Sequence, residues 1–349
     1  MKPAPAPSRR YARRLLRFLN ARGSRLSPLL ILMHDFPDPD TLASAAALAY
    51  ICEKGYGIES RIAYGGIIGR MENRAMVRLL RIPARKLGPR DLKRFENVAL
   101  LDTQPCFQNN PFPAARRAAL VIDQHPCTAK SLADLMLVDS ECGATSVILV
   151  QALLLARLEI PARIATALAY GILSDTANLY RSKRPDVIDA YVRILPFCDL
   201  KTLAVIQNPN RSKRFFSTLA RGIQNAWMRR GLVLSHLGPV ESPDLAAQIA
   251  DFLITYKKAR WAVCTGRYKN KLHVSLRTAG SPLDAGQFLR DIFPVRAQAG
   301  GHSGIAGGSF EIRDWTREDA WSEAERNFDD RLLRRLRLPV TGEAYYPFR

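Results

Sequence analysis

One stretch near the N-terminus decides the fold, and it reads Leu29-Leu30-Ile31-Leu32-Met33-His34-Asp35-Phe36-Pro37-Asp38-Pro39-Asp40. The unbroken apolar run from Leu29 to Met33 predicts a strand buried on both faces. The alanine- and leucine-rich run after Asp40 predicts a helix. The polar residues between the two runs therefore lie at the carboxyl end of a strand, where open α/β sheets bind their ligands.

An imidazole and two carboxylates stand within this turn, namely His34, Asp38 and Asp40. Such a cluster repels itself unless a cation lies inside it. The alternative is purely structural, with Asp40 capping the helix and Asp38 serving as a turn residue.

Three further acids occur at comparable positions. The apolar run Val98–Leu101 ends in Asp102, and the run 118–122 ends in Asp123-Gln124-His125-Pro126. Asp175 stands at the end of a helical segment that begins at Pro161. Because parallel strands deliver their carboxyl-end residues to one edge of the sheet, we expect these acids to converge there.

The length of 349 residues and a hydrophobic content of 47% are sufficient for two domains of ordinary size. We expect an α/β fold with a parallel-sheet N-terminal domain and a smaller α/β C-terminal domain. The expected parts are a basic N-terminal segment (1–25), the first domain (26–184), a helical connector (185–230), the second domain (231–315) and a basic helix with a tail (316–349).

Lys and Arg number 52 against 32 Asp and Glu, which gives a formal net charge of +20. Polyanions are the natural partners of such a surface, although charge alone can also serve solubility. Five arginines of the N-terminal segment alternate with apolar residues in a helical pattern: Arg9, Arg10, Arg13, Arg14 and Arg17. This helix either contacts nucleic acid or an anionic membrane, or packs on the domain with a solvated outer face.

Six scattered cysteines without metal-ligand spacing predict reduced core thiols of an intracellular protein: Cys52, Cys106, Cys127, Cys142, Cys198 and Cys264. No apolar stretch is long enough for a leader or a membrane span, so we expect a cytoplasmic protein. Glycine-rich stretches at 65–73 and 299–309 allow close approach to a phosphate. Neither has the G-x-G-x-x-G spacing after a strand, which argues against a dinucleotide-binding oxidoreductase.

Taken in order, these motifs resemble the DHH phosphoesterase family. The resemblance rests on His34-x-x-Pro37-Asp38-x-Asp40-x-x-x-Ser44, then Asp102, Asp123-Gln124-His125-Pro126 and Asp175-Thr176. Gly300-Gly301-His302, preceded by Val274-Ser275-Leu276-Arg277, is similar to the C-terminal substrate-binding domain of that family.

The resemblance implies a two-metal hydrolase with its active site in the cleft between the domains. His34 and Asp38 would bind one ion, Asp40 and Asp175 the other, and Asp102 would bridge them. His125, beside Asp123, would face the scissile phosphate, while Arg277, Gly300, Gly301 and His302 would bind the remaining phosphate. Oxygen ligands with imidazole suit manganese better than zinc, and two such ions supply hydroxide and relieve phosphoryl charge.

The third motif departs from the family because Gln124 stands where the first histidine normally binds the second metal. A carboxamide oxygen is a weaker ligand than imidazole, so the second site should be weak or differently filled. His125 is not expected to replace that ligand, since neighbouring residues at a strand end point in opposite directions.

The expected function is hydrolysis of short oligonucleotides, phosphoadenosine phosphate or linear dinucleotides, as an oligoribonuclease-like exonuclease or phosphatase. The alternative is a catalytically weakened nucleotide or RNA sensor that uses the same cleft. Short RNA, short DNA or nucleotides are the expected ligands, and the sequence leaves the oligomeric state open, a homodimer included.

Overall fold

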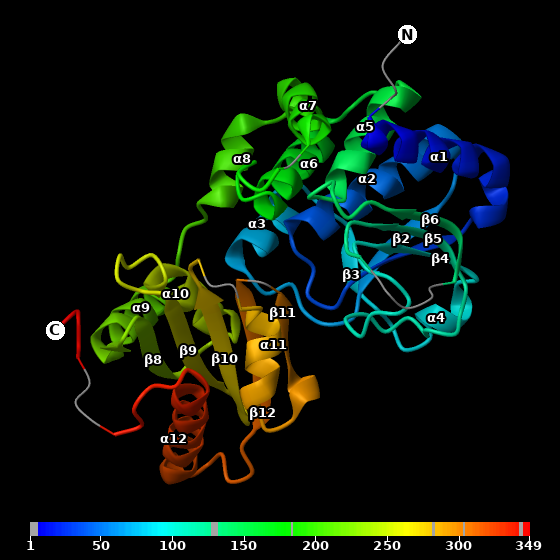
Figure 1. Cartoon of the computed structure of the whole chain (residues 1–349). Coiled ribbons are helices and arrows are strands. Elements are labelled where there is room, and N and C mark those ends of the chain that lie inside the picture. The colour runs from blue at the N-terminus through cyan, green and yellow to red at the C-terminus, as the bar shows by residue number, and fades with distance from the viewer. Residues whose placement is uncertain (1–5, 127–131, 183, 281–282, 303, 342–344) are drawn as a thin grey trace. The chain divides into compact units, whose positions relative to one another are not determined.

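The computed structural model describes the chain except for residues 1–5, 127–131, 183, 281–282, 303 and 342–344. The chain divides into two compact units, Met1–Pro209 and Asn210–Arg349 (Figure 1). The segment 185–230, expected as a connector, is therefore shared between the two units. Among the described residues, no helix combines the length and the apolar character needed to cross a membrane.

The first unit contains a six-stranded parallel sheet in the order β3-β2-β1-β4-β5-β6. Its strands are β1 (Leu29–Met33), β2 (Ser60–Tyr64), β3 (Ala84–Lys86), β4 (Asn97–Leu101), β5 (Ala118–Asp123) and β6 (Ala133–Val138). The strand order reverses between β1 and β4, which pair in parallel. Ligands of open α/β sheets bind at this switch point, beyond the carboxyl ends of the strands.

Strand β1 is buried along its whole length, as expected of a central parallel strand. Leu29, Ile31 and Met33 face a large core, whereas Leu30 and Leu32 face a smaller core on the other side of the sheet. This alternation follows from the two-residue period of a strand, and it fixes β1 firmly between two layers.

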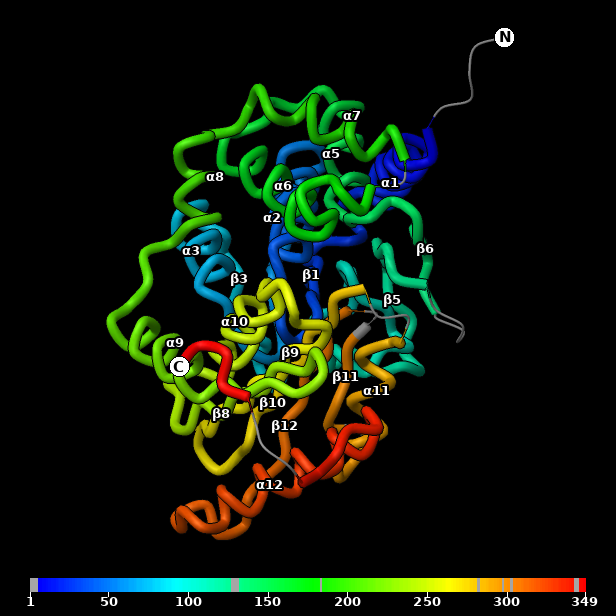
Figure 2. The backbone as a smooth tube through the Cα atoms, turned by 60° about the vertical axis from the view of Figure 1, so that its left-hand side comes forward, coloured from blue at the N-terminus to red at the C-terminus, as the bar shows by residue number. Residues whose placement is uncertain are grey.

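The helices of the first unit pack against this sheet, and all but the shortest supply the larger core on one face, while the shortest contributes Leu92 to the smaller core (Figure 2). They are α1 (Pro7–Arg22), α2 (Pro39–Tyr56), α3 (Met71–Leu79), α4 (Asp91–Arg94), α5 (Ser146–Ala156), α6 (Ala162–Asp175), α7 (Pro185–Ile194) and α8 (Leu200–Gln207), with 3-10 turns at Gly23–Leu26 and Leu195–Phe197. Helix α5 is apolar on nearly all sides and is buried from Ser146 to Leu153, so it occupies the centre of the helical layer.

The second unit contains a mixed sheet in the order β11-β12-β10-β9-β8-β7, in which only the β8–β9 pair is parallel. Its elements are α9 (Lys213–Asn225), β7 (Trp227–Arg229), β8 (Leu232–Pro239), α10 (Asp244–Leu253), β9 (Trp261–Tyr268), β10 (Lys271–Thr278), α11 (Ala285–Ile292), a 3-10 turn (Arg296–Gln298), β11 (Ala299–His302), β12 (Ile305–Glu311) and α12 (Glu318–Arg335). The predicted α/β class, with a parallel first sheet and a smaller second domain, is confirmed.

Local structure departs from the sequence pattern in three places. In the second glycine-rich stretch, residues 299–302 of β11 pair antiparallel with residues 305–308 of β12. Strands β3 and β7 were not expected, because three polar or mixed residues give too short a pattern to read. Their pairing with β2 and β8 supplies the hydrogen bonds that local sequence does not predict.

The cysteines agree with the expectation of free thiols at Cys52, Cys142, Cys198 and Cys264. Cys106 is instead disulfide-bonded, so the expectation of a reduced core thiol is wrong for this residue. Cys106 lies in a partly exposed loop and not in the core. Cys127 falls outside the described residues.

Candidate metal centre

The turn between β1 and α2 carries the first group of polar side chains. Asp38 is the N-cap of α2, and its Oδ1 accepts a hydrogen bond of 2.9 Å from the backbone N–H of Thr41. Its other oxygen lies 3.9 Å from Nε2 of His34. Asp38 therefore caps the helix, and Asp40, one residue into the first turn, is left fully buried for another role.

The first glycine-rich stretch holds this turn in place. The backbone N–H of Ile67 donates to the carbonyl of Asp35 at 2.9 Å. A Cβ atom on Gly66 would lie 2.3 Å from that carbonyl oxygen, so only glycine permits the contact. Asn73 of α3 donates from Nδ2 to the carbonyl of Pro37 at 3.0 Å. These contacts give the 65–73 stretch a structural role in supporting His34 and Asp38.

Asp102 occupies the centre of the site, directly after β4. It is a non-glycine residue with a positive φ of 56°, an uncommon conformation that marks a constrained backbone. Thr41 donates a hydrogen bond of 2.7 Å to Oδ2, and Thr145 donates one of 2.9 Å to Oδ1. The carboxylate is buried, and Nε2 of His34 lies 3.9 Å from its Oδ2. Two hydroxyls therefore hold Asp102 in one orientation.

Asp40 joins helix α2 to the N-terminus of α5. Its two oxygens accept hydrogen bonds from the backbone N–H groups of Thr145, at 2.6 Å, and of Ser146, at 2.8 Å. Burial, followed by the charges of Asp102 and Asp38, raises the pKa of Asp40 well above its usual value. Each oxygen of a carboxylate has a second lone pair, so these hydrogen bonds leave Asp40 able to bind a cation.

Asp175, the last residue of α6, faces the same space. Burial raises the pKa of Asp175 well above its usual value, and the charges of Asp38, Asp40 and Asp102 raise it further. Gln124 donates a hydrogen bond of 2.7 Å from Nε2 to Oδ2 of Asp175. In this structure Gln124 is therefore a neutral hydrogen-bond donor to an acid of the cluster.

Asp123 organises the turn that follows β5. Its Oδ1 accepts hydrogen bonds from the backbone N–H of Gln124, at 2.8 Å, and of His125, at 3.1 Å, and lies 2.8 Å from Nδ1 of His125. Gln104 donates from Nε2 to Oδ2 of Asp123 at 2.7 Å and to the carbonyl of His125 at 2.7 Å. Asp123 is fully buried, so it positions His125 and does not itself face solvent.

The side chain of His125 is half exposed, at 50%, and its Nδ1 lies 3.6 Å from Oδ1 of Asp102. Partial burial lowers the pKa of His125, but its hydrogen bond to Asp123 and the charges of Asp102, Asp123 and Asp38 raise it to about 9. Gln124 and His125 thus have different partners, Asp175 and Asp123 respectively. His125 also comes close to the central acid, which strand geometry alone did not predict.

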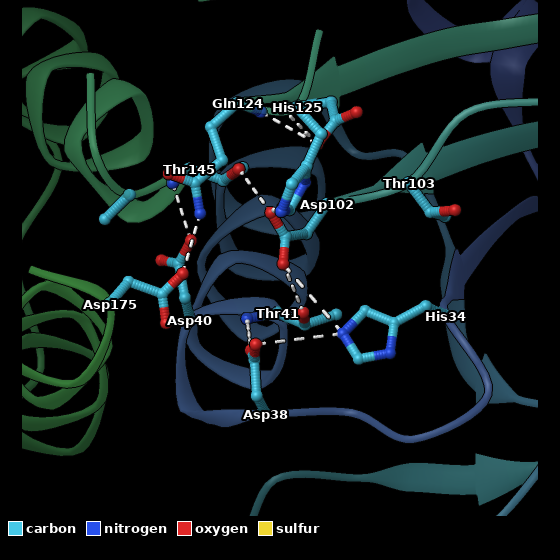
Figure 3. Close-up of polar contacts among 12 residues, drawn as sticks. His34, Asp38, Asp40, Thr41, Asp102, Thr103, Gln124, His125, Thr145 and Asp175 are labelled. Atoms are coloured by element: carbon cyan, nitrogen blue, oxygen red, sulfur yellow. Dashed lines mark hydrogen bonds and ion pairs between the residues drawn. The ribbon is translucent and has the colours of Figure 1, made fainter. Parts of the chain in front are cut away.

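Three groups of potential metal ligands meet at Asp102 (Figure 3). In each group the ligand atoms lie within 4.8 Å of one another. The groups are His34, Asp38 and Asp102; Asp40, Asp102 and Asp175; and Asp102, Asp123 and His125. Carboxylate oxygens with one or two imidazoles suit hard or borderline divalent cations such as Mg²⁺ and Mn²⁺. Burial and, after it, the charges of neighbouring carboxylates raise the pKa values of Asp40 and Asp175, and a bound cation would offset both effects.

In the second unit, Arg277 of β10 is buried and contacts both its own strand and helix α10. Its Nε is paired with Oδ1 of Asp251, and its Nη1 donates to Oγ of Ser275 and to the carbonyl of Leu276, both at 2.9 Å. Gly300 and Gly301 lie in β11, where Gly301 has a φ of 147°. A Cβ on Gly301 would lie 2.2 Å from the carbonyl oxygen of Ile305, so close strand packing requires this glycine. His302 ends β11, and its side chain lies outside what the structure describes.

Several residues of the site were missed from the sequence. Thr41 and Thr145 hold Asp102, and Gln104 holds Asp123 and the His125 backbone. The stretch Gly143-Ala144-Thr145-Ser146 before an apolar helix was an available signal, since such residues favour a helix N-terminus. Gln104 carried no comparable signal, because its partners lie 19 and 21 residues further along the chain.

No protein-family model matches this sequence. The chain is 31% identical over 331 residues to MJ1633, an uncharacterized protein of Methanocaldococcus jannaschii. The match covers 95% of this chain and 67% of that protein.

Among solved structures, an exopolyphosphatase-related protein from Bacteroides fragilis is similar with a TM-score of 0.69 and 14% identity. The similarity covers 95% of this chain and 99% of that one. RecJ from Thermus thermophilus, solved in complex with Mn²⁺, has a TM-score of 0.54 and 14% identity, covering 97% of this chain and 56% of RecJ. This chain thus spans little more than half of RecJ, and at these identities the similarity establishes a shared fold.

Proposed function

We propose that this chain hydrolyses phosphate esters with the help of bound divalent metal ions. The chain belongs to the same family as MJ1633 and has the fold of the DHH phosphoesterases. The observation that carries the proposal is the convergence of His34 and four acids at one edge of the first sheet, centred on Asp102. In the sequence these residues are spread from position 34 to position 175.

The donor groups fit two ions that share one carboxylate. His34 and Asp38 would hold one ion, Asp40 and Asp175 the other, and Asp102 would contribute to both. When bound, such ions supply a hydroxide nucleophile and neutralise charge on the phosphoryl oxygens. The chain's own contribution is rigidity, because Thr41 and Thr145 fix the orientation of Asp102.

In this proposal the second ion, which Asp40 and Asp175 would hold, is bound more weakly than the first. Asp40, Asp102 and Asp175 provide only carboxylates, and Gln124 donates a hydrogen bond to Asp175 where a stronger ligand would stand. Rotation of the Gln124 amide would offer its oxygen instead, which is a neutral and weaker ligand than imidazole. Manganese is the proposed metal because it accepts this mixed set of ligands, and the solved structure of RecJ contains Mn²⁺.

His125 is the proposed catalytic group for the leaving oxygen. Its raised pKa, about 9, keeps the ring protonated at neutral pH in the metal-free protein. A protonated imidazole can donate to a phosphate oxygen or to the departing alkoxide. Asp123 holds Nδ1, which leaves Nε2 available for that donation. Asp123 is therefore a positioning residue, a narrower role than the catalytic one expected.

The proposed substrates are short oligonucleotides and small nucleotides, which suit a chain with a net charge of +20. Arg277, Gly300, Gly301 and His302 are proposed to bind a phosphate of the substrate. Arg277 would have to exchange its carboxylate partner, Asp251, for that phosphate. Inorganic polyphosphate belongs in the test panel, because the Bacteroides structure is described as exopolyphosphatase-related.

A second candidate function is a nucleotide or RNA sensor that has lost hydrolysis. The observation in its favour is Gln124, whose hydrogen bond to Asp175 already reduces the need for a second cation. The four acids beside His34, of which Asp40 and Asp102 are fully buried, favour the enzyme, because unneutralised carboxylates at such short distances are costly.

Hydrolysis of bis-p-nitrophenyl phosphate and of a fluorescent dinucleotide tests the proposal, with metal-free protein and with added Mn²⁺, Mg²⁺ or Co²⁺. We expect turnover that depends on metal and that is lost after chelation. Phosphoadenosine phosphate, linear dinucleotides, short RNA and polyphosphate then rank the substrates. Retained nucleotide binding with no turnover at any metal concentration would favour the sensor.

A further inference from the structure

Helix α1 is attached to the first unit by one side only. Ala12, Leu15 and Leu19 are fully buried and pack into the larger core. Ser8 anchors the start of the helix, since its hydroxyl donates to Oδ2 of Asp186 at 2.6 Å. The apolar side of α1 is therefore covered by the protein itself.

The opposite side of α1 is an arginine face formed by Arg9, Arg10, Arg13, Arg14 and Arg17, all of which are exposed. Helix α1 contains no Asp or Glu. Among the residues that the structure describes, none of these five arginines forms an ion pair. Arg14 and Arg17 donate only to backbone carbonyls, of Met136 and Arg13, both at 3.4 Å.

This concentration of charge is unfavourable for the helix alone, because arginines three or four residues apart lie side by side and repel. Helix α12 shows the usual solution. It combines four arginines with six acids: Arg326, Arg331, Arg334 and Arg335 with Glu318, Asp319, Glu323, Glu325, Asp329 and Asp330. The arginine face of α1 lacks such neutralisation within the described chain, which points to an anion from outside.

Aromatic rings lie among these arginines. The guanidinium carbons of Arg10 and Arg14 are 5.8 Å and 6.0 Å from the centre of the Tyr11 ring. Arg22 lies over the Phe18 ring at 5.7 Å. Both rings are partly exposed. Arginines interleaved with accessible aromatic rings are typical of surfaces that bind single-stranded nucleic acid.

We propose that the arginine face of α1 binds the phosphate backbone of single-stranded nucleic acid, at a place separate from the metal centre. A membrane surface fits less well, because an interfacial helix inserts its apolar side and that side of α1 is buried. Such a surface would give chains longer than a dinucleotide an additional anchor. It goes beyond the proposed function and does not depend on it, since binding requires no hydrolysis.

The test is binding of a fluorescent 15-nucleotide single strand to the full chain in EDTA, so that hydrolysis cannot occur. The variant carries Arg9→Ala, Arg13→Ala and Arg17→Ala, which alanine's high helix propensity should tolerate. We expect roughly tenfold weaker binding at low salt, and a slope of log K against log salt that is smaller by about 2. A dinucleotide should bind both proteins equally.

A matched control carries Arg326→Ala, Arg331→Ala and Arg334→Ala on α12, which removes the same charge from another exposed helix. We expect little change in oligonucleotide binding for this control. If both triple variants lost the same affinity for the oligonucleotide, the effect would depend on net charge alone, and the proposal would be overturned. So would unchanged binding of the α1 variant, provided that its thermal melt matches the parent. Vesicles with 30% anionic lipid that bind through the same three arginines would overturn the assignment to nucleic acid.

Discussion

The carboxyl edge of the first sheet and the β10–β12 region of the second unit were both expected to carry function, but they are built differently. At the first edge, acids face one another, and only hydroxyls, amides and imidazoles separate them. In the second region the expected phosphate-binding Arg277 already has a carboxylate, a hydroxyl and a carbonyl as partners. Its glycines lie in paired strands.

This difference shows which polar groups still require a ligand. A buried polar group with satisfied partners contributes to the fold, whereas carboxylates that raise one another's pKa have an unmet electrostatic need. Asp40 and Asp175 are of the second kind. Arg277 is of the first kind, and the proposed substrate phosphate would have to replace Asp251 at its guanidinium.

The largest expected effect comes from Asp102→Asn, which removes the carboxylate shared by all three ligand groups. We expect hydrolysis to fall by roughly 10³-fold, because several kcal/mol of metal-dependent stabilisation are lost. The rise in melting temperature on adding Mn²⁺ should also disappear. Asp251→Asn in the second unit is the control and should retain that rise. Full activity of Asp102→Asn would remove the basis for the metal centre.

Arg277→Ala should lower the free energy of unfolding by about 2 kcal/mol, because the ion pair between Arg277 and Asp251 is lost and a buried side chain is removed. Urea unfolding of the full chain measures this change. The increase in stability on adding Mn²⁺ should be unchanged, since the proposed metal centre lies in the first unit. An unaltered unfolding midpoint would mean that Arg277 is not held as its contacts indicate.

Thr41→Val removes the hydroxyl that orients Asp102 and keeps the shape of the side chain. Loss of a hydrogen bond to a proposed metal ligand should weaken Mn²⁺ binding by roughly tenfold. Thr41→Ser retains the hydroxyl and should bind almost as tightly as the parent. Isothermal titration of the metal-free proteins with Mn²⁺ compares the affinities of the parent, Thr41→Val and Thr41→Ser. Equal weakening by valine and serine would assign the effect to packing.

Gln124→His should strengthen binding of the second ion by about fivefold, because imidazole is a better ligand than a carboxamide. The hydrogen bond to Asp175 would be replaced by a ligand directed at the same space. Titration with Mn²⁺ should then resolve two binding events more clearly, with Gln124→Asn as the control. Unchanged metal dependence would mean that Gln124 lies away from the second ion.

The smallest expected effect concerns Asp186, an acid of the first unit that is fully paired. Burial raises its pKa, but hydrogen bonds from Ser8 and Arg184 outweigh this and lower the pKa below its usual value. A lowered folded-state pKa gives stability above about pH 4 that is lost as the pH falls through that pKa.

Asp186→Asn removes this contribution, which we place at about 1 kcal/mol or less after solvent screening. Melting temperatures from pH 7 to pH 3 should therefore converge for the two proteins at the acid end. A difference that persists unchanged at pH 3 would contradict the assignment of the effect to ionised Asp186.

Much of the first unit could be predicted because its central strands β1, β4 and β5 are short and apolar, and polar residues stand at the carboxyl end of each. The positions of Asp102, directly after β4, and of Asp123, at the end of β5, followed from that pattern alone. The constraint on Asp102 could not be predicted, since it depends on Thr41 and Thr145, which lie 61 and 43 residues away. Contacts between distant residues leave no trace in local periodicity.

The structure of the glycine-rich stretches was the hardest part to predict from the sequence. Glycine suggested phosphate loops, but Gly66 and Gly301 are required by close approach of backbone to backbone. Arg277 suggested an anion site, while its actual partner, Asp251, lies 26 residues earlier on α10. A residue type indicates what chemistry is available, and only the packing shows whether that chemistry is already used.

The amide hydrogens of Thr145 and Ser146, both directed at the Asp40 carboxylate, make the first turn of α5 a natural reporter. Any change in the charge at Asp40 alters the strength of these two bonds, and with it their protection from exchange with solvent deuterium. Loading of the centre can therefore be followed at two backbone positions by NMR or mass spectrometry, without substrate and without turnover.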